Sequence, residues 1–222
     1  YEISAWQLIQ LWTAEGFIHP QEKLPVVLPK ANRIENLQSL ELSSKYPRQI
    51  NSVLNSAIFP RLRKLCLRCS TESGKLSSLR HLSNLYILKI NGNLKLASET
   101  NAFPSNLTKI TINPDAFRDP HPLMKTLGRL TNLQIVKLWF IHDIVFELDI
   151  GMGEFPQLQV LHMRYIKVRQ WRLERGAMPR LRHLLIDSCH LSELPEELWS
   201  LTALPLVHLL WPSQECGAEE CL

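Results

Sequence analysis

The amino-acid sequence predicts an α/β solenoid, in which short parallel strands stack along one side of a coiled chain. Three observations lead to this fold class. An apolar block with the spacing L-x-x-L-x-L occurs eight times, with isoleucine, valine or methionine at some of the later positions. The first leucines of successive blocks are 25, 23, 22, 26, 25, 23 and 23 residues apart. Two blocks share a longer phrase, which begins Phe155-Pro156 in one and Met178-Pro179 in the other. This spacing and period are those of leucine-rich repeats.

The eight blocks define the expected strands. In each block the second and third apolar residues are two positions apart, so both lie on one face of a strand. A strand this short cannot bury its apolar face alone, and neighbouring strands must therefore stack and share a core. We expect repeats over residues 24–211, with the strands on the concave side of the solenoid. The blocks begin at Leu37, Leu62, Leu85, Leu107, Leu133, Leu158, Leu181 and Leu204.

The segments between the strands predict an irregular, loop-rich convex side. Many leucine-rich repeats carry an asparagine after the third leucine, but here that position mostly holds another residue. The backbone groups that it would bind must be satisfied in another way, so we expect loops in place of long helices. A proline precedes four of the strands, where its missing amide costs no ladder bond. The bulky residue before each proline is expected to fill the core; these are Phe59, Phe103, Phe155 and Met178.

Both ends of the chain lie outside the repeats. Ser4 and Gln7 have the spacing of a capping box, and apolar residues recur at helical intervals from Ala5 to Trp12. Within residues 1–23 this pattern predicts a short amphipathic helix that ends at Gly16, and on pattern alone it is a packing helix. Residues 212–222 are acidic and carry no repeat block, so we expect a tail there. Because the sequence begins with Tyr1, we expect it to be a fragment of a longer protein.

Composition favours an intracellular binding protein over other classes. The net charge of +4 is mildly basic, which favours an acidic partner but falls short of a nucleic-acid-binding protein. Five cysteines, an odd number, argue for a reducing compartment. The sequence shows no apolar run long enough for a membrane span and no signal peptide. We expect a cytoplasmic protein, which its parent could also bring to the nucleus or the inner membrane surface.

No motif in the sequence supports catalysis or cofactor binding. Cys66-x-x-Cys69 lacks a second pair of ligands, so we expect neither zinc nor redox chemistry there. The eight histidines form no H-E-x-x-H motif, and no G-x-S-x-G or G-x-x-x-x-G-K-[ST] occurs. We therefore expect no enzyme, no metal, and no ATP or ADP bound by this fragment.

The concave face is the expected binding surface, because its residues alternate with the buried pair on each strand. The candidates are mostly cationic or aromatic, the side-chain types that often anchor interfaces and steer acidic partners. A solvated face without a partner is the alternative for each residue. The candidates are Arg68, Lys89, Lys109, Lys137, Trp139, His162, Arg164, Tyr165, His183, Asp187, His208 and Trp211.

Two stretches carry a resemblance to a known family. Tyr1-Glu2-Ile3, followed by Leu-Ile-Gln-Leu-Trp-Thr-Ala-Glu-Gly-Phe-Ile over residues 8–18, resembles the winged-helix segment of plant NB-LRR disease-resistance proteins of the coiled-coil type. Residues 191–201 match the phrase L-x-x-L-P-x-x-L-x-x-L of their repeats. His142-Asp143 mimics the nucleotide-sensing motif of that family, but it follows the fifth repeat block, and we interpret it as a loop dipeptide.

The resemblance implies a plant immune receptor. Residues 1–23 would be a remnant of the winged helix in the nucleotide-binding switch region. The repeats would recognise a pathogen effector or a guarded host protein, and would restrain an upstream nucleotide-binding domain. The alternative is a repeat-only adaptor or decoy, for example the substrate receptor of a ubiquitin ligase.

Overall fold

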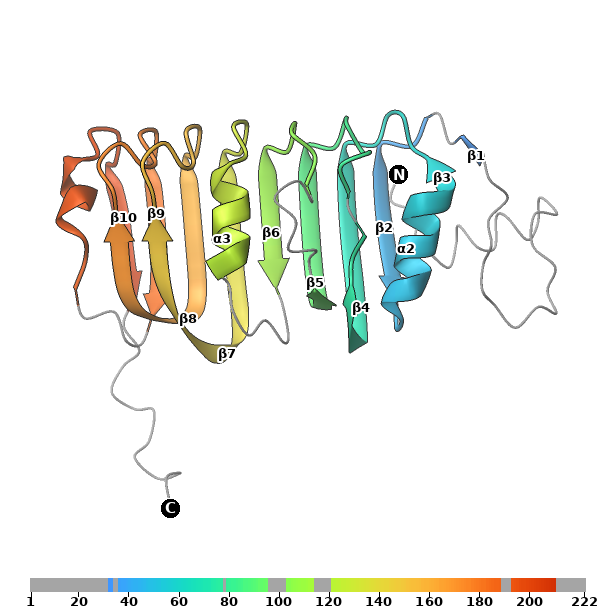
Figure 1. Cartoon of the computed structure of the whole chain (residues 1–222), viewed down its shortest axis with the longest axis horizontal. Helices are drawn as coiled ribbons and strands as arrows, with labels where there is room; N and C mark the ends of the chain where they lie inside the picture. The colour runs from blue at the N-terminus through green and yellow to red at the C-terminus, as the bar shows by residue number, and fades with distance from the viewer. Residues whose placement is uncertain are drawn as a thin grey trace, which may run out of the picture. The chain divides into compact units, whose positions relative to one another are not determined.

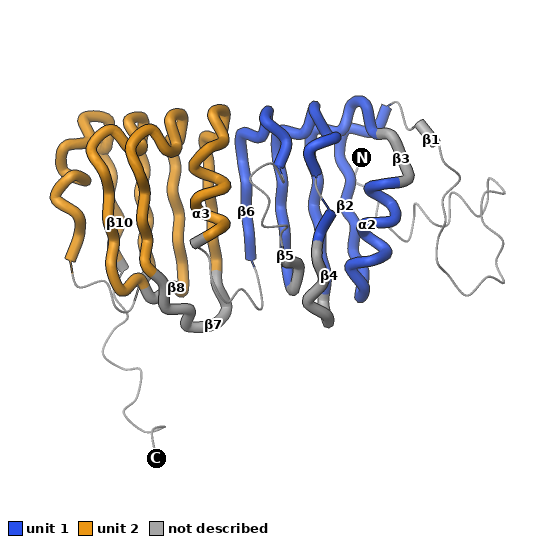
Figure 2. The backbone as a smooth tube through the Cα atoms, viewed as in Figure 1, with its two compact units in different colours: residues 1–117 blue, residues 118–222 orange. Residues whose placement is uncertain are grey.

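The computed structural model describes residues 32–33, 36–77, 79–95, 103–113, 121–188 and 193–210. The chain divides into two compact units, residues 1–117 and residues 118–222, which are coloured separately in Figure 2. The predicted amino-terminal helix, the tail over residues 212–222 and Trp211 lie outside the described residues. The proposed division of the chain at residues 23 and 211 therefore stays a prediction.

Unit 1 contains a parallel sheet of four strands in the order β2-β4-β5-β6 (Figure 1). These strands are β2 (Ser39–Ser44), β4 (Lys64–Lys75), β5 (Ile87–Lys95) and β6 (Lys109–Asn113). A two-residue strand, β1 (Asn32–Arg33), pairs in parallel with β3 (Ala57–Ile58). The helix α2 (Pro47–Ser56) follows β2 and packs against β2 and β4.

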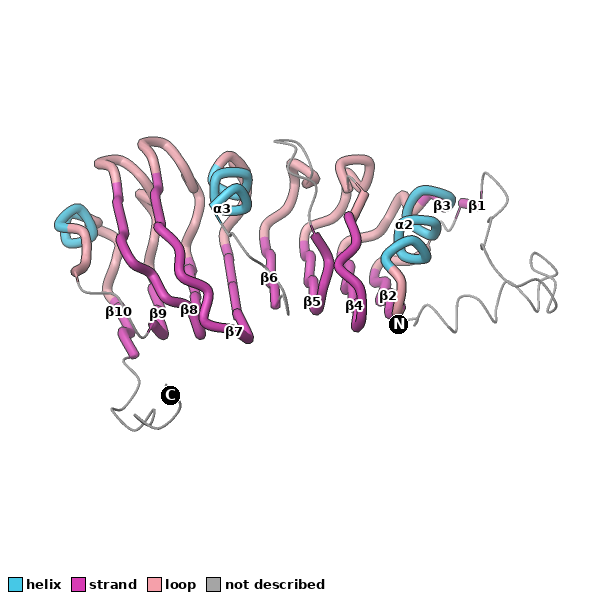
Figure 3. Tube along the Cα trace, turned by 60° about the horizontal axis from the view of Figure 1, so that its bottom comes forward, coloured by secondary structure: helices cyan, strands magenta, loops and turns pink. Residues whose placement is uncertain are grey.

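Unit 2 contains a second parallel series in the order β7-β8-β9-β10. Its strands are β7 (Ile135–Ile150), β8 (Val160–Leu173), β9 (His183–Ser188) and β10 (Leu206–Leu210). The helix α3 (His121–Gly128) contacts β7, and a 3₁₀-helix spans Glu196–Ser200. Figure 3 shows that, within each unit, the helix (α2 or α3) lies on the side of the repeats opposite to the parallel strands. No helix in the described part of the chain is long and apolar enough to cross a membrane.

The predicted fold class is confirmed by the strands themselves. Every one of the eight predicted blocks forms a strand that starts two residues after the first leucine, from Leu37 and Ser39 to Leu204 and Leu206. The second apolar residue of each block stacks on its counterpart in the next strand. In unit 1 this column runs Leu40, Leu65, Leu88 and Ile110, and in unit 2 it runs Val136, Leu161, Leu184 and Val207. All but Val207 are buried.

A repeated set of backbone hydrogen bonds fixes the register. The first leucine of a block closes a turn, as when the Leu62 amide donates to the Phe59 carbonyl at 3.3 Å. Just before the strand, one carbonyl accepts two amides from the next repeat. Gln38 takes the amides of Arg63 and Lys64 at 2.8 and 3.0 Å. The carbonyls of Arg63, Tyr86, Gln134 and Gln159 do the same.

Side chains just before the first leucine add a second link between repeats, which the sequence analysis missed. Asn84 Nδ2 donates to the carbonyl of Pro60 at 2.6 Å, and Asn106 Nδ2 donates to that of Ser83 at 2.8 Å. Many leucine-rich repeats carry an asparagine after the third leucine, and this chain mostly lacks it. Asn84 and Asn106 lie at the opposite end of the strand, before the first leucine. They satisfy carbonyls of the preceding turn, which would otherwise need another donor.

One expectation about local structure needs correction. Strand β7 continues to Ile150, so His142 and Asp143 lie within a strand and not in a loop as predicted. Strands β4, β7 and β8 are 12, 16 and 14 residues long, well beyond their apolar blocks. Their register shifts part-way, for example between Trp139 and Ile144, which allows the extension.

The residues before the four prolines fill the core, as predicted. Phe59, Phe103, Phe155 and Met178 are all buried. Phe155 and Met178 also have positive φ angles of 55° and 47°, a backbone conformation that is uncommon for bulky residues. Burial of the side chain therefore outweighs local backbone strain at these two turns.

The first prediction concerns this packing. Phe155→Ala should lower the free energy of unfolding by about 3–5 kcal/mol, because it leaves a cavity under the turn. Met152→Ala is the matched control, since Met152 is 76% exposed in the preceding turn and its loss should cost less than about 0.5 kcal/mol. Urea denaturation followed by circular dichroism measures both. Equal stability of the two variants would contradict the assigned role of Phe155.

The second prediction concerns Gly92, which pairs with Cys69 across β4 and β5. Its φ is 88°, and an added Cβ would overlap the carbonyl oxygen of Cys69. Gly153 also has a positive φ, but its Cβ would meet nothing within 4 Å. Gly153→Ala should therefore cost only the left-handed backbone penalty of about 1–2 kcal/mol.

Gly92→Ala should cost clearly more than Gly153→Ala, because it also pushes two strands apart. Thermal unfolding of the two variants separates backbone strain from crowding. If the two variants melted at the same temperature, the close approach of Gly92 to Cys69 would not be a constraint.

Candidate partner-binding surface

In each unit, the residues that alternate with the buried pair on each strand form a surface, which we call the outward face of that unit. In unit 1 its central row runs Glu41, Cys66, Lys89 and Thr111. The following row runs Ser43, Arg68, Asn91 and Asn113. In unit 2 the central row runs Lys137, His162, Leu185 and His208, and the following row runs Trp139, Arg164, Asp187 and Leu210.

The predicted surface residues of unit 1 are spread out. Arg68 forms an ion pair with Glu41, with 2.8 Å between Nε and Oε1. Lys89 lies in the central row, whereas Lys109 lies two residues before the central-row residue of its strand, in register with Ile87. The ion pair between Arg68 and Glu41 therefore neutralises part of the positive charge that the sequence predicts for the outward face of unit 1.

The Cys66-x-x-Cys69 motif is split between two faces. Strand β4 pairs regularly with β2 from Lys64 to Cys69, so residues three apart point to opposite sides of the sheet. Cys66 lies on the outward face, and the thiol of Cys69 lies 3.5 Å from the carbonyl of Lys45. Both are buried free cysteines. Within the described ranges, no group of three or more potential ligands could hold a metal ion.

Unit 2 brings three of the predicted histidines together, and we call His162, His183 and His208 the histidine row. His162 Nε2 lies 3.4 Å from His183 Nδ1, with the ring centroids 4.7 Å apart. The His183 and His208 rings are 5.7 Å apart, and both ring pairs are edge to face. His183 lies two residues before Leu185, the central-row residue of β9, so the contacts run diagonally across β8, β9 and β10.

Burial and nearby cations keep the first histidine neutral. The pKa of His162 falls from 6.5 to about 4, chiefly because burial penalises the charged imidazolium. Lys137, His183, Arg164 and His208 lower it further by charge repulsion. Nε2 of His183 is buried and has no hydrogen-bond partner among the described residues. His162 is therefore a neutral imidazole beside the fixed positive charges of Lys137 and Arg164.

Arg164 and Tyr165 form a second predicted pair, at a bulge in β8. Arg164 Nε lies 3.5 Å from Asp187 Oδ2, and its guanidinium lies 5.3 Å from the centre of the Tyr165 ring. Neighbouring strand residues normally point to opposite faces, but Tyr165 has a φ of 57° and the register shifts between Arg164 and Ile166. The bulge thus places an aromatic ring, 56% exposed, beside an arginine.

Each of these residues is predicted from the sequence, but their arrangement is not. The diagonal contact of the histidines follows from a two-residue offset between His162 and His183 within their blocks, which can be read from the sequence. The bulge at Tyr165 has no such signal, because neither glycine nor asparagine marks it. Trp139 lies in register with Arg164, and its Nε1 is buried without a partner in the described part of the chain.

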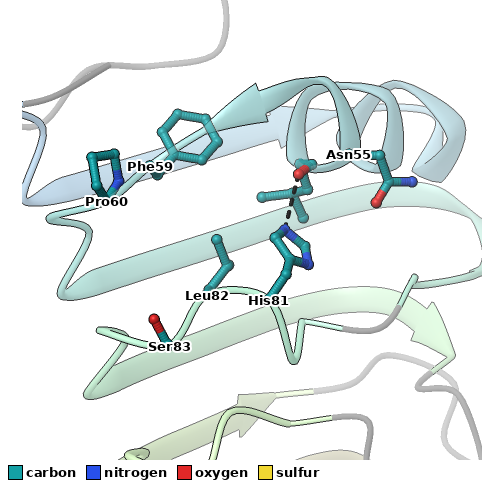
Figure 4. A pocket seen from close by; sticks show the side chains of 7 residues that line it. Asn55, Phe59, Pro60, His81, Leu82 and Ser83 are labelled. Carbon is teal, nitrogen blue, oxygen red and sulfur yellow. Dashed lines mark hydrogen bonds between the residues drawn. The ribbon is translucent and has the colours of Figure 1, made fainter. Parts of the chain in front are cut away.

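A separate hollow of about 450 Å³ lies in unit 1, between α2 and the turn after residue 79 (Figure 4). Its walls include the core residues Leu54, Phe59 and Leu82. His81 Nε2 lies 3.0 Å from the carbonyl of Leu54, so the hydrogen bond holds the two sides together. None of the predicted surface residues lines this hollow, and we interpret it as a packing groove between repeats.

Comparison with known proteins identifies relatives among plant resistance proteins. The late blight resistance protein homolog R1B-16 of Solanum demissum is 25% identical over 217 residues, which cover 93% of this chain and 16% of that protein. The disease resistance protein RPP8 of Arabidopsis thaliana is 27% identical, covering 82% of this chain and 24% of that protein. The probable disease resistance protein RF45 of the same plant is 30% identical, covering 80% and 18%.

The similarity thus extends over most of the chain but over a minor part of each relative. The chain spans about 16 to 24% of the length of these three proteins. No family model matches the chain.

The third prediction follows from the lowered pKa of His162. Between pH 6.5 and about 4 the unfolded chain binds a proton at His162 that the folded chain does not. The stability contributed by His162 is therefore fully present above pH 6.5 and is lost as the pH falls toward 4. Histidine resonances in NMR spectra should include one with a pKa well below 6.5, which is absent in His162→Gln.

Urea denaturation at pH 7.5 and pH 5 provides the second measurement. His162→Gln should lose less stability than the unmodified protein between these two pH values. An identical loss in both proteins would contradict the lowered pKa of His162.

Proposed function

Because the chain is a distant homologue of plant coiled-coil NB-LRR disease-resistance proteins and matches their leucine-rich repeat region, we propose that it recognises a protein partner in plant defence. The partner is a pathogen effector or a host protein that the receptor guards. Recognition takes place on the outward face, and above all in unit 2. The single observation that carries this proposal is the group of cationic and aromatic side chains there.

The make-up of this surface supports a protein partner. Lys137, His162 and Arg164 lie beside Trp139 and the exposed ring of Tyr165. Aromatic residues and arginine are the commonest anchors of protein interfaces, and the lysine and arginine would steer an acidic surface toward them. The parallel strands hold these residues on a rigid framework, so little conformational entropy is lost when a partner binds.

We also propose that the repeats act on a nucleotide switch elsewhere in the parent protein. The sequence contains no phosphate-binding G-x-x-x-x-G-K-[ST] motif, and the chain matches only a minor part of each relative. In this proposal residues 1–23 are a remnant of the winged helix of that switch. A partner can release the switch only if it binds more tightly to the active arrangement than to the restrained one.

The repeat-only adaptor is the second candidate function. It shares the binding surface but needs no switch, so the two functions differ in the proteins that accompany the chain. Recovery of ubiquitin-ligase subunits together with the chain would favour the adaptor. Recovery of a nucleotide-binding protein or of an effector would favour the receptor.

The fourth prediction tests the surface. The double variant K137E/R164E should reduce recovery of the partner from pathogen-challenged leaf tissue by about tenfold, which corresponds to about 1.4 kcal/mol. The matched control is Arg175→Glu, which reverses an exposed arginine in the turn after β8, away from the outward rows. Quantitative immunoprecipitation at low and at raised salt provides the measurement.

Raised salt should weaken capture by the unmodified chain, because exposed charges are screened. Capture that survives the double substitution, or that falls equally with Arg175→Glu, would place the binding surface elsewhere.

A further inference from the structure

We propose that the histidine row is a carboxylate-binding site and that it takes up a proton when it is occupied. The ligand is an aspartate or glutamate side chain of the protein partner. This inference rests on the proposed role of the outward face as a partner-binding surface, and it adds the chemistry and the pH dependence of that surface.

The geometry of the row supports this assignment. Three imidazoles from three neighbouring strands follow one another at centroid distances of 4.7 and 5.7 Å. Two ring nitrogens, on His162 and His183, approach to 3.4 Å, and the other nitrogen of His183 has no partner in the described residues. A buried ring nitrogen with an unmet hydrogen bond, such as Nε2 of His183, carries a free-energy cost. A ligand that accepts hydrogen bonds would remove this cost.

The charges around the row select an anion. Lys137 on β7 and Arg164 on β8 both lie close enough to His162 to depress its pKa. Strand β9 contributes Asp187, which pairs with Arg164, and His183, which is part of the histidine row. Strand β10 contributes His208, the third histidine of the row. A divalent cation would meet the repulsion of Lys137 and Arg164, whereas a carboxylate would be attracted by both.

Occupation by a carboxylate reverses the conditions that keep His162 neutral. Among the described residues, positive neighbours lower the pKa of His162 and no negative group raises it. A docked carboxylate supplies that charge, which favours the imidazolium and raises the pKa of His162. By linkage, binding that raises a pKa takes up protons and becomes tighter as the pH falls. The fixed charges of Lys137 and Arg164 attract the ligand at any pH, and the row adds the pH dependence.

The test uses the full chain and a synthetic hexaglutamate peptide as the probe, with a chelator present to exclude metal ions. Calorimetric titration at pH 6.5 in two buffers of different ionisation enthalpy measures the protons taken up per peptide bound. We expect about 0.5–1 proton for the unmodified chain, and an affinity that rises as much as about tenfold from pH 7.5 to pH 6.5. The double variant H162Q/H183Q should take up almost none.

His81→Gln is the matched control, because His81 lies in unit 1 and bonds the carbonyl of Leu54, outside the row. It should keep the proton uptake of the unmodified chain. His208→Gln provides a milder variant, should the double variant fail to fold by circular dichroism; it should reduce the uptake in part.

The outcomes separate this inference from the proposed function. Binding of the peptide without proton uptake, or with equal uptake in H162Q/H183Q, would overturn the carboxylate site while leaving the outward face as a docking surface. Failure of the unmodified chain to bind the peptide, together with retained capture of the plant partner, would also overturn the site but not the function. Loss of both would overturn both.

Discussion

The structure depends above all on one backbone interaction, in which the carbonyl just before a strand accepts two amides from the next repeat. It occurs at Gln38, Arg63 and Tyr86 in unit 1, and at Gln134 and Gln159 in unit 2. Because it joins one fixed position in successive repeats, it sets the register of each strand pair. A slip of one residue would turn every leucine of a block from the core to solvent. The outward rows exist only because this register is kept, and the candidate site is therefore a product of backbone bonding as much as of its own side chains.

The repeats could be predicted from the sequence because apolar burial and strand geometry act through the same spacing. Leu158, Leu161 and Met163 have no alternative arrangement that buries all three on a parallel strand, and the strand indeed starts at Val160. Asn84 and Asn106 could not be predicted from the usual asparagine motif, because they lie before the first leucine and not after the third. Their role follows from the carbonyls of the preceding turn, which need a hydrogen-bond donor.

The candidate site was predictable as a set of residues but only partly as an arrangement. Alternation along a strand placed Lys137, His162 and Arg164 on one face without further information. The contact between His162 and His183 depends on a diagonal between strands, which requires the register and not only the alternation. The position of Tyr165 depends on a bulge with a positive φ at a residue type that rarely adopts it. Such strain is maintained by the surrounding sheet, so no local sequence signal marks it.

The shared phrase at Phe155-Pro156 and Met178-Pro179 has a consequence for how such a chain changes over generations. The two phrases are 23 residues apart, and each begins a turn that leads into a strand. Unequal recombination between them would remove or add one whole repeat and leave the turns and strands of the remaining repeats in the same order. The core would persist, because its columns are built from aliphatic side chains of similar size. Only the outward rows would acquire a new order of side chains, so the same event that leaves the scaffold intact would create a new surface for selection to act on.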